Sequence, residues 1–328
     1  MLEMDARRIR TNGIDMHIVQ QGDGPMILLC HGFPETSHAW RHQLAPLARA
    51  GFRAVAPDLR GYGLTDSPDA VDAFDIRHLV ADMVGVLDAL DVPQAIIVGS
   101  DWGATVAWQA AATRPDRFRG VVALGVPMMA PPPVPPTQIF PQTADALLYA
   151  LYFQPEGPAE AELERDPRQS LLKILYWASG DAGPRDAGQT TPNPFAMVSR
   201  TQGMLAALPM PSALPAWLDE ADLEAYVQAF ARSGWRGGLN YYRNLDANWA
   251  LERQYDDPQV KVPALFLAGE RDPGLSIPGM RDIIAGMPSL VPRLQASRII
   301  PGCGHWVSQE RPEALSAAII EFARGLDA

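Results

Sequence analysis

The stretch Ile96-Ile97-Val98-Gly99-Ser100-Asp101-Trp102-Gly103-Ala104 decides the fold of this 328-residue chain. Its apolar, β-branched start predicts a buried strand, and the small residues that follow predict a tight turn into a helix. Such a turn needs small residues two positions before and two positions after its apex, because larger side chains would collide with the neighbouring helix. Gly99 and Gly103 flank Asp101 in this way, whereas a valine and a tryptophan flank Ser100. Asp101 is therefore the predicted apex residue.

Short apolar runs alternate with helical patterns on both sides of this stretch. The predicted strands cover residues 26–30, 54–57, 95–99 and 121–124, and the predicted helices cover residues 36–50, 75–90 and 104–113. This alternation is typical of an α/β protein with a mostly parallel, twisted sheet flanked by helices. Two earlier segments, residues 7–10 and 16–20, predict an antiparallel edge of the sheet.

The alternation stops after Leu124, at a run with five prolines in the six positions 131–136. Proline fits neither a helix interior nor a central strand, so this run predicts a stiff linker. Helical patterns without a convincing strand follow at residues 144–153, 171–178, 218–231 and 239–249. Strands at 264–268 and 297–300, and helices near 278–285 and over 311–323, then resume the α/β pattern. We predict a core of residues 1–130 and 252–328 with an inserted helical cap, residues 131–251, that begins with the Pro-rich linker.

Composition excludes several classes of partner. With 27 Lys and Arg against 38 Asp and Glu, the formal net charge is -11 and no basic cluster occurs, so nucleic-acid binding is not expected. The longest apolar runs are far shorter than the roughly 20 residues that span a bilayer, so no membrane association is expected. Residues 1–8 do not resemble a signal peptide, and the two cysteines, Cys30 and Cys303, are too few for a disulfide framework. These observations predict a cytoplasmic, soluble protein.

Asp101 is a suitable nucleophile at the apex of the turn. An aspartate has a pKa of about 3.9, so it is ionised at neutral pH without an activating base. It attacks an electrophilic alkyl carbon to form an ester. The competing interpretation is an aspartate that only caps the following helix.

Hydrolysis of such an ester needs a water molecule, a base that activates it and a carboxylate that orients the base. Asp272 follows the strand at 264–268, and His305 follows the strand at 297–300, in the usual order of nucleophile, acid and histidine. Glu270 is a less favoured acid because it lies nearer the end of its strand. Both acids also fit ordinary turn residues.

The other histidines have less specific surroundings. His38 and His42 have the spacing of a metal-binding pair, but no third ligand accompanies them in a recognisable motif, so we predict no metal. The remaining three are assigned to a turn or to surface elements: His31, His17 and His78.

The loop His31-Gly32-Phe33-Pro34 begins where the strand at 26–30 ends. On this kind of sheet an oxyanion hole combines a backbone N–H from this loop with one just after the nucleophile. Phe33 and Trp102 are the predicted donors. A plain Gly-Pro turn is the alternative explanation of the loop.

Four motifs together resemble the α/β-hydrolase fold epoxide hydrolases, of the soluble epoxide hydrolase type, over nearly the whole chain. They are His-Gly-Phe-Pro-Glu at 31–35, Asp-Leu-Arg-Gly-Tyr-Gly at 58–63, Gly-Ser-Asp-Trp-Gly at 99–103 and Gly-Cys-Gly-His-Trp at 302–306. The resemblance implies a cofactor-independent enzyme that converts a small-molecule epoxide to a vicinal diol beneath its cap. The apolar cap residues favour a lipophilic epoxide: Trp177, Phe195, Met197 and Trp235. The choice between monomer and homodimer stays open.

The resemblance also implies two cap tyrosines that donate protons to the epoxide oxygen. Tyr149 lies in a match to the family's Tyr-x-x-Tyr-Phe-Gln, although Ala150 replaces a glutamine common in relatives, and Tyr242 is the second donor. A phenol with a pKa near 10 is protonated at pH 7 and can serve. Tyr152 and Tyr241 are the alternatives for these two assignments.

Two other functions compete with epoxide hydrolysis. Haloalkane and haloacid dehalogenases share the aspartate nucleophile and the cap, but a leaving halide needs N–H donors rather than phenols. Haloalkane relatives tend to carry Glu or Asn in place of Phe33, and haloacid relatives place an arginine where Trp102 stands. A non-catalytic small-molecule-binding protein is the third possibility, since a fold alone does not establish function. The complete set of nucleophile, acid, base and phenols favours the epoxide hydrolase.

Overall fold

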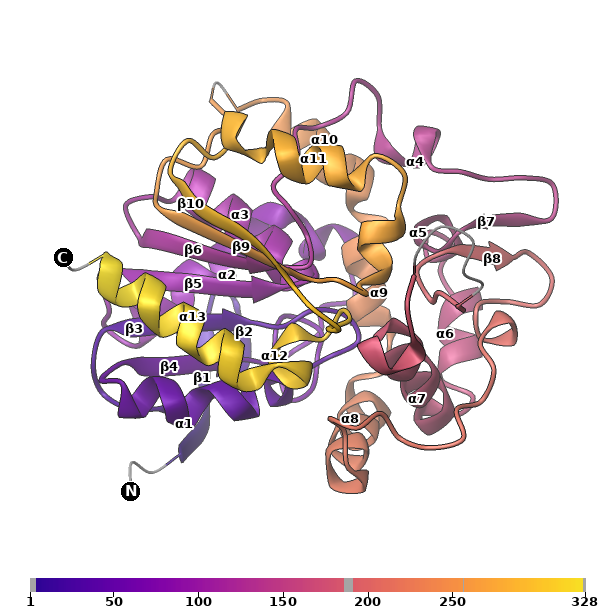
Figure 1. The fold of residues 1–328 in the computed structure, drawn as a ribbon, viewed down its shortest axis with the longest axis horizontal. Coiled ribbons are helices and arrows are strands. Elements are labelled where there is room, and N and C mark those ends of the chain that lie inside the picture. Colours follow the sequence, from indigo (N-terminus) through magenta and orange to yellow (C-terminus); the bar gives the residue numbers. More distant parts are fainter. Residues whose placement is uncertain (1–3, 186–190, 256, 327–328) are drawn as a thin grey trace.

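A computed structural model of the protein describes residues 4–185, 191–255 and 257–326, and eight of its strands form one twisted sheet (Figure 1). β1 pairs antiparallel with β2, β2 pairs antiparallel with β4, and the pairs beyond β4 are parallel, as the sequence predicts. Residues 1–3 of the N-terminal segment lie outside the described residues. In their order across the sheet, the strands are β1 (Met4–Thr11), β2 (Ile14–Gln21), β4 (Arg53–Pro57), β3 (Met26–Cys30), β5 (Ala95–Ser100), β6 (Phe118–Leu124), β9 (Ala264–Gly269) and β10 (Leu294–Ile300).

Helices cover both faces of this sheet, which explains why its central strands are apolar throughout. Leu28 and Ile97 pack in one core cluster with α2 (Ile76–Ala89) and α3 (Trp102–Thr113). Their neighbours Ile27 and Ile96 point to the opposite face and pack with two other helices, α1 (Arg41–Arg49) and α13 (Pro312–Gly325). Neighbouring residues of a strand therefore face opposite sides of the sheet and pack against different helices. The parallel strands all end at the same edge of this sheet.

The segment between β6 and β9 forms the cap, which lies beside that edge in Figure 1. The predicted absence of strands there is wrong: β7 and β8 pair antiparallel over three residues each, too few to leave an alternating pattern in the sequence. Its elements are α4 (Pro136–Ile139), β7 (Ala146–Leu148), α5 (Tyr149–Tyr152), α6 (Pro158–Leu163), α7 (Pro167–Ala178), β8 (Met197–Ser199), α8 (Glu220–Ser233), α9 (Arg236–Arg243) and α10 (Leu245–Glu252).

Two predicted cap helices have different bounds in the structure. The helix predicted over 144–153 is strand β7 followed by the short α5, and the one predicted over 239–249 divides into α9 and α10 at Asn244. The Asn244 side chain donates hydrogen bonds to the carbonyl oxygens of Val71 and Asn240, at 2.6 and 2.9 Å. An asparagine that binds backbone carbonyls in this way competes with a continuous helix.

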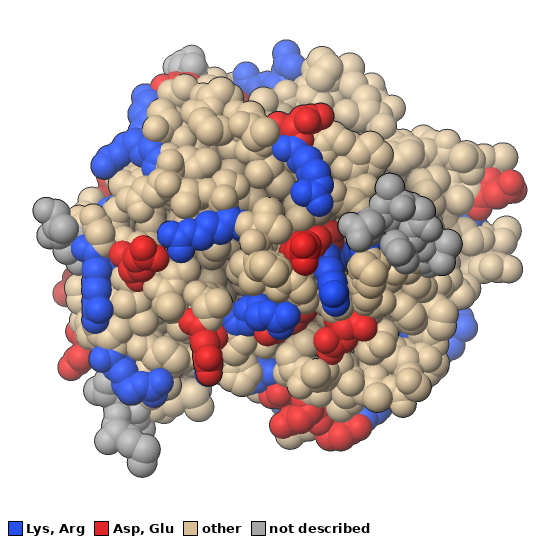
Figure 2. Space-filling model, viewed as in Figure 1, with Lys and Arg blue, Asp and Glu red and all other residues tan. Residues whose placement is uncertain are grey.

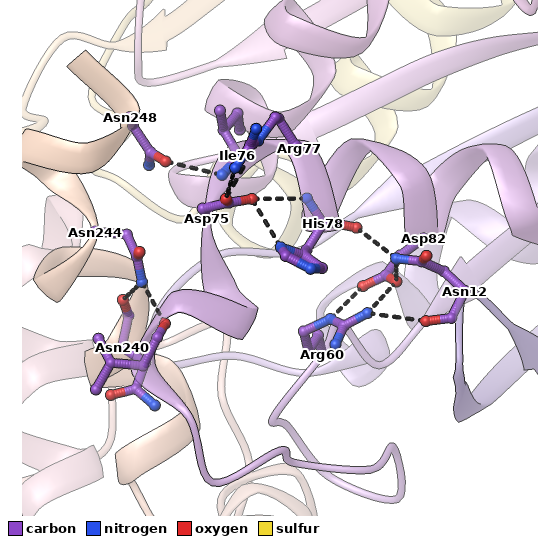
Figure 3. Close-up of polar contacts among 11 residues, drawn as sticks. Asn12, Arg60, Asp75, Ile76, Arg77, His78, Asp82, Asn240, Asn244 and Asn248 are labelled. Carbon is purple, nitrogen blue, oxygen red and sulfur yellow. Dashed lines mark hydrogen bonds and ion pairs between the residues drawn. The ribbon is translucent and has the colours of Figure 1, made fainter. Parts of the chain in front are cut away.

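The last two cap helices are fastened to the core by buried hydrogen bonds (Figure 3). Oδ1 of Asn248 accepts from the backbone N–H of Ile76 at 2.8 Å, at the start of α2. The Tyr241 hydroxyl donates to the carbonyl oxygen of Arg60 at 3.0 Å, and the guanidinium of Arg60 forms a buried ion pair with Asp82. Helix α9 therefore keeps a fixed position over the sheet edge.

On the face in Figure 2, acidic and basic side chains are interspersed. Within the described ranges, no helix is long and apolar enough to cross a membrane. Nor does this part of the chain contain a cluster of three His, Cys, Asp or Glu residues suited to a metal ion; Nε2 of His38 instead lies 2.7 Å from Oδ1 of Asp222 on the cap.

Candidate active site

Asp101 stands at the apex of a strained turn between β5 and α3. Its φ is +54°, a left-handed value that is uncommon for residues other than glycine. A Cβ on Gly99 would lie 1.9 Å from the carbonyl oxygen of Gly103, and a Cβ on Gly103 would lie 2.1 Å from that of Cys30. The predicted need for small residues on both sides of Asp101 is confirmed.

The Asp101 side chain does not cap α3, so the capping interpretation is wrong. It makes no cap hydrogen bond, and its Oδ1 instead accepts the backbone N–H of Phe33 at 2.8 Å. Trp102 is the first residue of α3, where a backbone N–H has no partner within the helix. Of the two amides proposed for an oxyanion hole, that of Phe33 is therefore already bound to the carboxylate, and that of Trp102 begins the helix next to it.

His305 joins Asp101 to Asp272. Nδ1 of His305 donates to Oδ2 of Asp272 at 2.9 Å, and its Nε2 lies 3.5 Å from Oδ2 of Asp101. All three side chains are buried or nearly so, with exposures of 6% for His305, 1% for Asp272 and 13% for Asp101. Glu270, the less favoured acid, binds a different group: its Oε2 accepts the backbone N–H of Gly302. The structure brings together the three residues that the sequence selects.

The charges of the two aspartates change the protonation of His305. Burial lowers the pKa of His305, but Asp272 and Asp101 more than offset this effect and hold that pKa well above its usual value. The two aspartates therefore favour the protonated, imidazolium form of His305. Loss of the charge on Asp101 would lower the pKa of His305 again.

Two cap tyrosines meet over this group. The rings of Tyr149 and Tyr242 lie 5.6 Å apart, and the ring of Tyr242 packs against Phe33 at 5.5 Å and Trp102 at 5.1 Å. Burial, together with the charge of Asp101, raises the pKa of both phenols above its usual value. Both hydroxyls therefore stay protonated at neutral pH and are available as donors.

The two alternative tyrosines are engaged elsewhere. The Tyr152 hydroxyl donates to Oε2 of Glu162 at 2.8 Å, and the Tyr241 hydroxyl donates to the carbonyl oxygen of Arg60. These contacts draw both hydroxyls away from Asp101. The geometry thus favours Tyr149 and Tyr242, the first choices from the sequence.

The other residues singled out in the sequence take different places. His31 shapes its turn: its Nε2 accepts the backbone N–H of Leu59 at 2.9 Å, and its Nδ1–H donates to the carbonyl oxygen of Gly32. Among the apolar cap residues, Phe195 reaches the site, with its ring 5.1 Å from His305 and 5.4 Å from Tyr149. Trp235 packs behind Phe33, whereas Met197 is exposed.

Glu35 is a residue of the site that sequence reasoning missed. Its side chain is fully buried, its Oε1 accepts from Nε2 of Gln309 at 2.7 Å, and its Oε2 has no partner in the described structure. Burial raises the pKa of Glu35 to about 7, while the charge of His305 acts in the opposite direction. The one available signal was its place in the 31–35 motif, a carboxylate close to the predicted oxyanion loop.

Comparison with known proteins agrees with this geometry. A sequence profile described as the alpha/beta hydrolase fold matches residues 25–312, so the protein is an α/β hydrolase. Epoxide hydrolase A of Mycobacterium tuberculosis is 39% identical over 98% of this chain and 98% of its own. The structure of an epoxide hydrolase from an endophytic Streptomyces superposes with a TM-score of 0.91 at 39% identity, covering 99% of this chain and 96% of that one. Epoxide hydrolase A from Mycobacterium thermoresistibile gives 0.90 at 38% identity, covering 98% and 99%. The chain belongs to the epoxide hydrolase family.

Proposed function

We propose that this epoxide hydrolase converts a lipophilic epoxide and water to a vicinal diol through a covalent ester on Asp101. The observation that carries this proposal is the convergence of Asp101, the Asp272–His305 pair and two cap tyrosines in one cluster of contacting side chains. Phe195 and the aromatic neighbours of Tyr242 give that cluster an apolar wall, which suits a lipophilic substrate.

In the first step, Oδ2 of Asp101 attacks a ring carbon. Oδ1 is held by the Phe33 amide, whereas Oδ2 lies 3.5 Å from Nε2 of His305 and is the attacking atom. A carbon–oxygen ester bond forms while the ring carbon–oxygen bond breaks. The released alkoxide takes a proton from Tyr149 or Tyr242, whose raised pKa makes the phenol a donor rather than a phenolate.

In the second step, His305 activates a water molecule that attacks the ester carbonyl. Esterification removes the charge of Asp101, so the pKa of His305 falls and its Nε2 proton passes to the tyrosinate. The neutral Nε2 is then a base, held in place by Asp272. The amides of Phe33 and Trp102 stabilise the oxyanion that forms at Oδ1. Oε2 of Glu35 is a second acceptor for the attacking water. Collapse of the intermediate breaks the ester bond, and the expelled alkoxide takes the proton of the new Asp101 carboxyl and leaves as the diol. Asp101 is again a carboxylate, and His305 keeps the proton that it took from the water.

The same proposal covers the organisation and location of the chain. Residues 131–251 act as a cap over a core made of residues 1–130 and 252–328, with the cap supplying both phenols. No cofactor, metal or nucleic acid takes part in the steps above. Cys30 and Cys303 are unpaired and buried, which supports a cytoplasmic location because reduced thiols persist there.

Intact-protein mass spectrometry of a His305→Gln variant tests the reaction. This variant should form the ester and fail to hydrolyse it, so exposure to styrene oxide should add the mass of the whole epoxide. A second sample exposed to a 1-haloalkane examines the dehalogenase alternative, in which only the alkyl group would be added.

The Asp101→Asn variant is the control, and it should gain no mass from either reagent. An alkyl adduct from the haloalkane without an epoxide adduct would assign the protein to dehalogenation. No adduct with epoxides of several sizes would instead support a binding protein without catalysis.

A further inference from the structure

The cap and the catalytic histidine loop meet at one buried carboxylate that the reaction above does not use. Glu310 is the last residue of α12 (Val307–Glu310) and is 7% exposed. Its Oε2 accepts two backbone N–H groups, from Gly304 at 2.8 Å and from Gly180 at 2.9 Å. Its Oε1 accepts the backbone N–H of Trp306 at 3.0 Å.

These three amides belong to two different parts of the molecule. Gly304 and Trp306 are the residues immediately before and after His305, whereas Gly180 follows cap helix α7. One side chain thus fixes both flanks of the histidine and joins them to the cap. A carboxylate that accepts several N–H donors holds them strongly, because each hydrogen bond is charge-assisted.

Other contacts show how closely the two segments approach. The backbone N–H of His305 donates to the carbonyl oxygen of Ala178 at 2.9 Å, and the indole N–H of Trp306 donates to that of Leu175 at 2.7 Å. A Cβ on Gly180 would lie 2.3 Å from the carbonyl oxygen of Gly302. The loop that carries His305 is therefore seated directly on the end of α7.

We infer that Glu310 is a positioning residue for ester hydrolysis, through which the cap sets the orientation of His305. This inference rests on the proposed two-step reaction. His305 must align with both Asp272 and the water during hydrolysis, whereas attack by Asp101 on the epoxide depends on the carboxylate and the phenols. A displaced histidine loop should therefore slow the second step and spare the first.

The variant Glu310→Gln tests the inference, because an amide has one acceptor oxygen in place of two. If that oxygen faces Gly180 and Gly304, the N–H of Trp306 loses its acceptor; if it faces Trp306, the two glycines lose theirs. In either orientation, at least one of the two residues next to His305 loses its hydrogen bond to residue 310. Single-turnover reactions with styrene oxide, quenched and read by intact mass, give the rates of ester formation and ester hydrolysis separately.

We expect hydrolysis to slow about 10- to 100-fold, as for small displacements of a catalytic group, with ester formation unchanged and the ester accumulating. Glu313→Gln, an exposed glutamate in the first turn of α13, is the matched control and should behave as the wild type. The variant Gly180→Ala adds a Cβ that disturbs the same contact from the side of the cap. It should also slow ester hydrolysis and not ester formation, so the inference can still be tested if Glu310→Gln does not fold.

Equal slowing of both steps, or of neither, in the folded variants would overturn the inference. A wild-type protein that forms no ester at all would instead overturn the proposed reaction, so the two failures are distinguishable.

Discussion

Nε2 of His305 lies 3.5 Å from Oδ2 of Asp101, so the proposed nucleophile also helps to raise the pKa of the proposed base. The aspartate charge contributes to the raised pKa of the imidazole, and an ester on Asp101 removes that charge. In the proposed reaction, the charge of Asp101 favours the protonated form of His305, and His305 becomes a base only after Asp101 is esterified. The proposal thus implies that water is not activated before there is an ester to attack.

Replacing Asp101 with Asn should lower the pKa of His305, because the variant keeps the shape of the side chain and loses its charge. NMR titration of the imidazole nitrogens measures this pKa directly. Asp222→Asn, which changes a carboxylate beside His38 on the cap, is the control and should leave the His305 titration unchanged. An unaltered His305 pKa in Asp101→Asn would show that Asp101 does not control the protonation of the base.

Replacing Tyr149 or Tyr242 with Phe should slow ester formation, since each variant loses one proton donor to the epoxide oxygen. We expect a loss of about 10²-fold for each, within the usual range for general acid catalysis, and a larger loss for the double variant. Rapid-quench measurement of ester formation gives these rates. Tyr152→Phe removes a hydroxyl that binds Glu162 instead, so it should leave ester formation near the wild-type rate. A comparable loss in Tyr152→Phe would reverse the assignment.

The stability of Glu35→Gln relative to the wild type should depend on pH. The pKa of Glu35 in the folded protein is about 7, above the ordinary 4.5, so folding favours the protonated carboxyl. Its contribution to stability is therefore present below pH 4.5 and is lost as the pH rises toward 7. Since one pH unit corresponds to about 1.4 kcal/mol, the variant should gain about 3 kcal/mol relative to the wild type over this window.

Urea unfolding at pH 5 and pH 8 tests this expectation, and Glu313→Gln, at an exposed glutamate in the first turn of α13, serves as the reference. A difference between Glu35→Gln and the wild type that stays constant over this pH range would contradict it.

Replacing Gly99 with Ala should destabilise the protein by about 3 kcal/mol, because the new Cβ would overlap the backbone of Gly103 and neither segment can retreat. The loss of free energy of unfolding is the quantity to measure. Gly286→Ala is the paired control, since nothing lies within 4 Å of a Cβ at that position. Similar stability in the two variants would show that the turn can relax around an added methyl group.

The sequence predicted those parts of the site that depend on neighbouring residues. Gly99, Asp101 and Gly103 constrain one another within a single turn, so their spacing alone identifies the apex. The ends of the parallel strands likewise bring Asp272 and His305 to the same edge, because the sheet order follows from the alternation of strands and helices.

Features that depend on distant partners could not be predicted in this way. Glu35 is defined by its bond to Gln309, which is 274 positions away, and nothing in the local sequence reveals that its Oε2 is buried without a partner. Strands β7 and β8 pair over only three residues each, and each is too short to show a period of its own. These features follow from tertiary packing, which the local pattern does not contain.

The neighbouring tyrosines of α9 make different contacts: the Tyr241 hydroxyl binds the carbonyl oxygen of Arg60, and the ring of Tyr242, the proposed proton donor, packs against Trp102 beside Asp101. The hydrogen bond of Tyr241 therefore holds Tyr242 in place relative to the core, although Tyr242 lies in the cap segment of the sequence. To change the substrate scope, substitutions should therefore be made in α5 and at Phe195. The side formed by Tyr242 should be kept, and a new substrate must fit against it.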